Sequence, residues 1–186
     1  MYRTIFAAFG SARPATIALA ALVVATHAPA HAQQAPAACK LLQIAEIESA
    51  LGGKASTKLS GSKQSVPGMT LDECGVEVPE PGRKGVHVVS IRIVTDLPLD
   101  AGEAIRMRNG GTAREPQWKD TGARLEQKAV GGASCIMSGR PNVAGHSTCS
   151  IPRGKGYVEV DVTGSVLELV PLDTVAALLQ KAVSRM

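Results

Sequence analysis

The chain has 186 residues, a formal net charge of +4 and 45% hydrophobic residues, but only 3% of its residues are aromatic. Surfaces that bind single-stranded nucleic acids stack bases on aromatic side chains, so this composition argues against a nucleic-acid partner. A core made mainly of Val, Ile, Leu, Ala and Met is expected instead.

Residues 1–32 have the pattern of a cleavable secretory signal. Arg3 and Arg13 give the segment its positive charge, and an apolar run at 15–25 follows. This run is too short to cross a bilayer, which needs about 20 apolar residues. Ala30 and Ala32 are the small residues that signal peptidase requires, so cleavage is predicted after Ala32. We therefore expect a periplasmic or secreted protein with no transmembrane segment in its mature chain.

Cleavage would leave a short tether at 33–38 and a single domain at 39–186. Only two of the 20 basic residues and none of the 16 acidic residues lie in the predicted signal, so the net charge falls from +4 to +2. The mature chain of 154 residues is long enough to bury one core.

The four cysteines all lie in the predicted mature domain, at Cys39, Cys74, Cys135 and Cys149. An even number of cysteines in an oxidising compartment favours two disulfides. Three pairings are open, and we favour the sequential one, Cys39–Cys74 and Cys135–Cys149. Lipidation of Cys39 is the less favoured alternative, because Pro36 stands where a lipidation signal usually has Leu. The cysteines lack the close spacing of a zinc site, so neither a metal nor a cofactor is expected.

The first half of the domain alternates helix and strand patterns. A helix is expected over 41–51, ending at Gly52-Gly53, and the Ser- and Gly-rich stretch at 54–68 reads as a loop or weak edge strand. Two strands at 74–78 and 86–95 and a helix at 101–108, ended by Gly110-Gly111, complete this half.

The second half contains a polar connection and further strands. It is predicted to contain a connection at 112–123, strands near 124–130 and 133–138, a loop at 139–147, a strand at 157–163 and a helix from Pro171 to about Val183. Runs of strands between helices favour an α+β fold, an antiparallel sheet with helices packed on one face.

The opening Cys39-Lys-Leu-Leu, then Glu46-Ile47 and Leu51-Gly52, resembles the start of several uncharacterised exported bacterial α+β domains, many of them lipoproteins. In these domains a cysteine leads into a short helix, and a second cysteine follows on an early strand. The resemblance implies the same fold and compartment and brings no known activity.

Candidate catalytic patterns are sparse. Ser60-x-x-Lys63 matches a penicillin-recognition motif but lacks its helical context, and 145–149 differs from a nucleophile elbow by Cys149 in place of Gly. Ser134-Cys135 is faintly similar to the nucleophile segment of L,D-transpeptidases, and a thiol nucleophile there would need a base such as His87. A small cell-wall-directed enzyme using Cys135 or a serine is therefore the alternative function, and we assign no catalytic residue.

The favoured function is non-enzymatic binding in the cell envelope. The candidate binding residues are basic side chains that the fold must bring together: Arg106, Arg108, Arg140, His146 and Arg153. An envelope protein, a polyanion or a small ligand is the expected partner, because clustered cations attract acidic groups. His87 lies in the strongest strand, on the same face as Val89 and Ile91, so we expect it to have a structural role.

Overall fold

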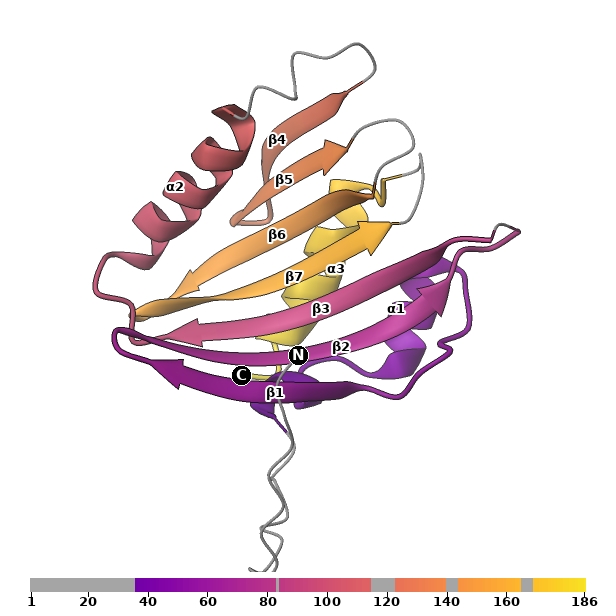
Figure 1. Ribbon diagram of the computed structural model, residues 1–186, viewed down its shortest axis with the longest axis horizontal. Helices are drawn as coiled ribbons and strands as arrows, with labels where there is room; N and C mark the ends of the chain where they lie inside the picture. Colours follow the sequence, from indigo (N-terminus) through magenta and orange to yellow (C-terminus); the bar gives the residue numbers. More distant parts are fainter. Residues whose placement is uncertain (1–35, 83, 115–122, 140–143, 165–168) are drawn as a thin grey trace, which may run out of the picture. The chain divides into compact units, whose positions relative to one another are not determined.

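The computed structural model describes residues 36–186 except 83, 115–122, 140–143 and 165–168. Its centre is a seven-stranded antiparallel sheet in the order β1-β2-β3-β7-β6-β5-β4 (Figure 1). The strands are β1 (Ser60–Val66), β2 (Met69–Pro79), β3 (Val86–Thr95), β4 (Arg124–Val130), β5 (Ala133–Gly139), β6 (Gly145–Arg153) and β7 (Gly156–Gly164). The predicted α+β class is confirmed, and β3 and β7, the two strands with the clearest sequence patterns, pair at the middle of the sheet.

One face of the sheet is covered by α1 (Ile44–Leu51) and α3 (Leu172–Val183), as Figure 1 shows. Val158, Val160 and Val162 alternate along β7 toward this face and pack with the fully buried Leu179. Because alternate residues of a strand share a face, this arrangement gives the main core its aliphatic composition. We call this side of the sheet the helix face.

The remaining helix, α2 (Ala101–Arg114), packs on the opposite face of the sheet. Val94, Ala101, Ile105 and Ile136 are buried but lie outside the main core, and together they form the apolar contact of α2. The charged residues Arg92, Glu159 and Asp161 also lie on this side, so we call it the polar face. The prediction of helices on a single face thus holds for α1 and α3, while α2 covers one end of the other face.

Both predicted disulfides are present. Cys39–Cys74 closes a separation of 35 residues and joins the start of the described chain to β2. Cys135–Cys149 joins directly paired residues of β5 and β6. Because the sulfur of Cys39 is bonded to Cys74, it is not available for lipid attachment in this structure.

The domain begins before Cys39. A 3-10 helix spans Ala37–Lys40, and Ala38 is fully buried. The carboxylate of Asp72 accepts hydrogen bonds from the backbone N–H groups of Ala37 (3.0 Å) and Ala38 (2.9 Å). The end of the predicted tether is therefore packed into the domain, while its beginning, like the predicted signal, lies outside the described residues.

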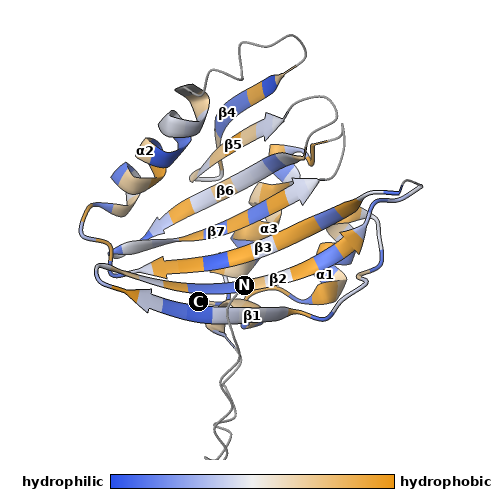
Figure 2. Ribbon diagram, viewed as in Figure 1, coloured by the Kyte–Doolittle hydropathy of each residue, from blue (hydrophilic) through white to orange (hydrophobic). Residues whose placement is uncertain are grey.

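Several boundaries differ from the sequence prediction. The first α-helix begins at Ile44 rather than Leu41. The helix α2 continues through Gly110-Gly111 to Arg114, and its residues Ile105 and Asn109 are buried. The stretch at 54–68 contains the edge strand β1, which Figure 2 shows as largely hydrophilic, in contrast to the largely hydrophobic β3.

The largest error concerns β6, since the predicted loop at 139–147 includes the start of a nine-residue strand. Its sequence is polar, but Ser147 and Ser150 are fully buried. A central strand of this composition is stable only because its backbone pairs on both sides and several of its side chains find hydrogen-bond partners.

Candidate functional site

A network of charged side chains crosses the polar face at the centre of the sheet. Arg92 of β3 stands opposite Glu73 of β2 and Glu159 of β7 in the strand registers. Its guanidinium donates to Glu73 Oε1 at 2.7 Å and to Glu159 Oε1 at 3.0 Å. The Glu159 carboxylate is buried, so its charge must be compensated within the protein.

Arg108, on α2, is the second arginine that forms an ion pair with Glu159. Its Nη1 forms an ion pair with Glu159, and its Nη2 donates to Ser150 Oγ at 2.8 Å. The Ser150 hydroxyl in turn donates to Glu159 Oε2 at 2.9 Å. The guanidinium also lies 5.6 Å from the ring centre of Tyr157, within range of a cation–π interaction. Burial lowers the pKa of Arg108, which stays fully charged near neutral pH.

These contacts hold two arginines at a fixed spacing while about a third of each side chain remains exposed. We refer to Glu73, Arg92, Arg108, Ser150 and Glu159 as the Glu159 cluster. It joins β2, β3, β6 and β7 to α2, so side chains distant in sequence meet at one place.

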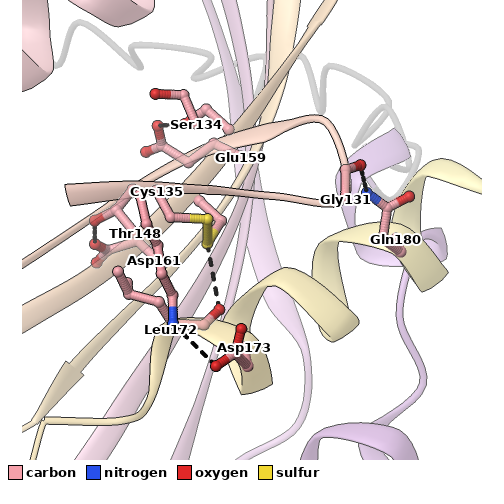
Figure 3. The surroundings of a disulfide bond; sticks show 12 residues. Gly131, Ser134, Cys135, Thr148, Glu159, Asp161, Leu172, Asp173 and Gln180 are labelled. Carbon is pink, nitrogen blue, oxygen red and sulfur yellow. Dashed lines mark hydrogen bonds and ion pairs between the residues drawn. A yellow bond between two sulfur atoms is a disulfide. The ribbon is translucent and has the colours of Figure 1, made fainter.

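A second group lies further along β6 and β7. The buried Asp161 carboxylate accepts hydrogen bonds from Thr148 at 2.5 Å and from Thr163 at 3.1 Å (Figure 3 shows Thr148 beside Asp161). Thr163 Oγ1 lies 3.0 Å from His146 Nδ1, and that nitrogen lies 3.7 Å from Asp161 Oδ2. Since the Thr163 hydroxyl donates to Asp161, it can accept the proton on His146 Nδ1.

The electrostatics of this group favour a charged pair. Burial alone would raise the pKa of Asp161, but the interactions with His146 and Thr148 outweigh it and lower the pKa. The Asp161 carboxylate raises the pKa of His146 against the opposing effect of burial. The imidazole remains about half exposed, so it presents a titratable group at the surface.

The structure brings together part of the predicted binding set. Arg108 and His146 belong to neighbouring polar groups on one face, and Arg106 lies on the same helix as Arg108, where it lines a small pocket against β4 and β5. Arg153 is exposed at the end of β6, outside these contacts. Arg140 lies outside the described residues. His146 sits in a strand rather than in the predicted loop.

Sequence reasoning missed the central carboxylates. Glu159 and Asp161 are the polar positions of the alternating run predicted at 157–163, a pattern typical of a strand with one side toward solvent. Both are buried, because β7 lies mid-sheet and hydroxyl and guanidinium groups from β3, β6 and α2 cover them. The signal available in the sequence was the presence of two acidic residues on one side of a strand whose other side is apolar.

His87 lies on the helix face, as predicted, and is buried. It borders a cavity of about 290 Å³ between the ends of α1 and α3, and its Nδ1 lies 3.8 Å from Glu80 Oε1. Burial lowers the pKa of His87, while the Glu80 carboxylate acts in the opposite direction. The two described histidines thus lie on opposite faces with opposite pKa shifts.

The catalytic patterns lack the geometry that their chemistry requires. Cys135 is buried in a disulfide beside the start of α3, where Cys149 Sγ lies 3.6 Å from the Leu172 carbonyl (Figure 3). Ser60 and Lys63 lie three apart on β1, so their side chains point to opposite faces. In the described part of the chain, no three side chains of the usual metal-binding types gather at one place.

Comparison with known proteins adds no relative: no family model, curated protein or solved structure matches the chain. Across the described residues, none of the helices combines the length and apolar character needed to cross a membrane.

Proposed function

We propose that this chain is an exported domain of the cell envelope that binds a partner presenting acidic groups and that it does so through the end of the polar face covered by α2. The observation that carries the proposal is the Glu159 cluster. One buried carboxylate holds Arg92 and Arg108 in place while each guanidinium keeps an exposed edge.

The geometry suits recognition because it is preorganised. Arginine side chains lose conformational entropy when they bind, and this loss is smaller where the side chain is already fixed. Arg92 donates through Nε and Nη1 to the cluster, and its Nη2 has no hydrogen-bond partner among the described residues. Guanidinium N–H groups match the oxygens of carboxylates and phosphates.

Arg106 adds an exposed cation at this end of the polar face. It is exposed on α2 and forms no ion pair within the described part of the chain. An acidic partner is therefore favoured over a basic one at this end of the face. Export is supported by the N-terminal sequence pattern, and both disulfides suit an oxidising compartment.

The test is capture of an envelope partner by the purified, oxidised protein. Arg106→Glu should reduce capture at least fivefold, because it reverses an unpaired charge at the proposed surface. Lys63→Glu makes the same charge change on the exposed edge strand β1 and should leave capture unchanged. Capture should also weaken as salt rises, since exposed charges are screened.

Equal capture by the wild type and Arg106→Glu would overturn the proposed surface. The compartment is tested separately by mass spectrometry of the protein recovered from an envelope fraction. A mature N-terminus at Gln33 is expected, whereas an intact residue 1 on a cytosolic protein would overturn the proposed export.

A further inference from the structure

A small polar pocket lies between α2 and the strands β4 and β5, next to the Glu159 cluster. It has a volume of about 270 Å³ and is lined by Arg106, Asn109, Gly110, Gln127, Lys128, Ser134 and Cys135. No carboxylate is among these lining residues, and we call it the α2 pocket. Its volume corresponds to about nine water molecules, at about 30 Å³ each.

The acceptor oxygens of Asn109, a buried residue that lines the α2 pocket, already accept hydrogen bonds. Asn109 is buried, and its side-chain oxygen accepts from Arg108 Nε (3.3 Å) and Nη2 (3.2 Å). Its backbone carbonyl accepts from Gln127 Nε2 at 3.0 Å. The acceptors of Asn109 therefore face donors within the protein.

Donors in the same pocket keep unused capacity. The Asn109 amide donates one N–H to Ser134 Oγ at 3.1 Å, which leaves a second N–H on the same nitrogen. The Gln127 amide likewise has a second N–H, and the Ser134 hydroxyl accepts from Asn109 while keeping its own proton. A molecule entering the pocket thus meets several available hydrogen-bond donors, together with the acceptor oxygen of the Gln127 amide.

The charged side chains around the pocket also favour an anionic ligand. Lys128 is held by Asp173 at 2.9 Å on the helix-face side, so its charge is largely compensated. Arg106 also lines the pocket and forms no ion pair among the described residues, while its Nη1 lies beside Gly102, as does Asp100 Oδ1. An arginine side chain without an ion pair, beside several hydrogen-bond donors, suits the acceptor oxygens and negative charge of a small anion.

We infer that the α2 pocket binds one anionic oxygen-bearing group, a carboxylate or a phosphate, with Arg106 as its counter-charge. This inference rests on the proposed function, since it names the chemical group of the acidic partner that would enter the polar face. The pocket lies just below the range of about 300–1,000 Å³ that is typical of small-molecule pockets, which suits one small acidic group.

The experiment is an NMR titration of the ¹⁵N-labelled purified protein with inorganic phosphate and, separately, with acetate. Ionic strength is held constant with sodium chloride, so that screening alone produces no change. Saturable shifts are expected at the side-chain amides of Asn109 and Gln127 and at the backbone amide of Gly110. Tighter binding of phosphate would indicate that the pocket prefers a phosphate group, and tighter binding of acetate that it prefers a carboxylate.

Arg106→Gln should weaken the affinity about tenfold, because it removes a charge-assisted interaction. Arg153→Gln removes an exposed arginine outside the pocket and serves as the matched control, with no expected change. Both side chains are exposed, so both variants should fold.

Absence of saturable shifts at these three positions would overturn the inference, and so would an unchanged affinity in Arg106→Gln. If the NMR titration shows no anion binding but capture of an envelope partner still depends on Arg106, the anion site is rejected and the proposed function stands. If the anions bind saturably but no partner is captured, the proposed function is rejected and the anion site stands.

Discussion

The two faces of the sheet use different means to bury side chains. On the helix face, aliphatic side chains pack under α1 and α3, and both disulfides lie among them. On the polar face, Glu159 and Asp161 are buried about as deeply, but each is surrounded by hydrogen-bond donors and cations. The comparison teaches that apolar burial tolerates many arrangements, whereas a buried carboxylate is acceptable only with particular partners in place.

The helix face should give the largest loss of stability when its cross-links are removed. Replacing Cys39 and Cys74 together by alanine should lower the free energy of unfolding by about 4 kcal/mol, and replacing Cys135 and Cys149 by about 3 kcal/mol. The first pair closes the longer loop, with a separation of 35 residues against 14. Denaturant unfolding of both double variants measures the order.

The reverse order would show that chain entropy does not control the contribution of these disulfides. The second bond joins residues that the sheet already pairs directly, so the lower value is expected on structural grounds as well. The unfolding m-value should be followed in parallel, because removal of a cross-link also expands the unfolded chain.

The next largest loss of stability should come from the polar face, when the Glu159 carboxylate at its centre is replaced. Glu159→Gln keeps the shape of the side chain but removes the charge that holds Arg92 and Arg108. We expect a loss of about 2 kcal/mol, below the 3–5 kcal/mol of a fully buried pair, because the arginines can turn toward water.

Glu73→Gln is the matched control for this change. Glu73 contacts the same Arg92 but is about a third exposed, so its loss should be below about 1 kcal/mol. Equal losses in thermal or denaturant unfolding of the two variants would contradict the central role given to Glu159.

The smallest effects on stability should come from the two histidines, whose contributions depend on pH in opposite directions on the two faces. Burial lowers the pKa of His87, so the unfolded state binds its proton more tightly, and stability falls as pH drops below about 6.5. The Asp161 carboxylate raises the pKa of His146, so His146 stabilises the fold below about pH 6.5 and loses this contribution as pH rises through its folded pKa.

His87→Gln should therefore reduce the loss of stability between pH 7.5 and pH 5, and His146→Gln should increase it. Unfolding curves at matched ionic strength measure both slopes. A change of the same sign in both variants would contradict the opposite environments of the two residues.

Much of the helix face could be predicted from the sequence. The alternation along 86–95 and 157–163 and the helical spacing of Val175, Ala176 and Leu179 anticipated β3, β7 and α3, because apolar periodicity records which side of an element is buried. The disulfide pairing was also anticipated, although the sequence alone left three pairings open.

The polar face could be predicted only in fragments. Arg108 and His146 belong to the predicted basic set, but their partners Glu159 and Asp161 occupy the polar positions of an alternating strand, a pattern typical of a solvent-facing side. β6 was missed because its buried Ser147, Thr148 and Ser150 have no apolar pattern. Its burial depends on neighbours that the linear pattern does not identify.

The sequence by itself thus determined the α+β class, the strands β3 and β7 and the expectation of two disulfides, since these follow from local periodicity and cysteine count. Only the tertiary structure decided that α2 crosses to the other face and brings Arg108 onto Glu159 beside Arg92. The physical reason is that hydrophobic burial is non-directional and readable from composition along one segment. A charge network requires specific atoms from β2, β3, β6, β7 and α2 to meet within hydrogen-bond distance, and this depends on the strand order and the placement of α2.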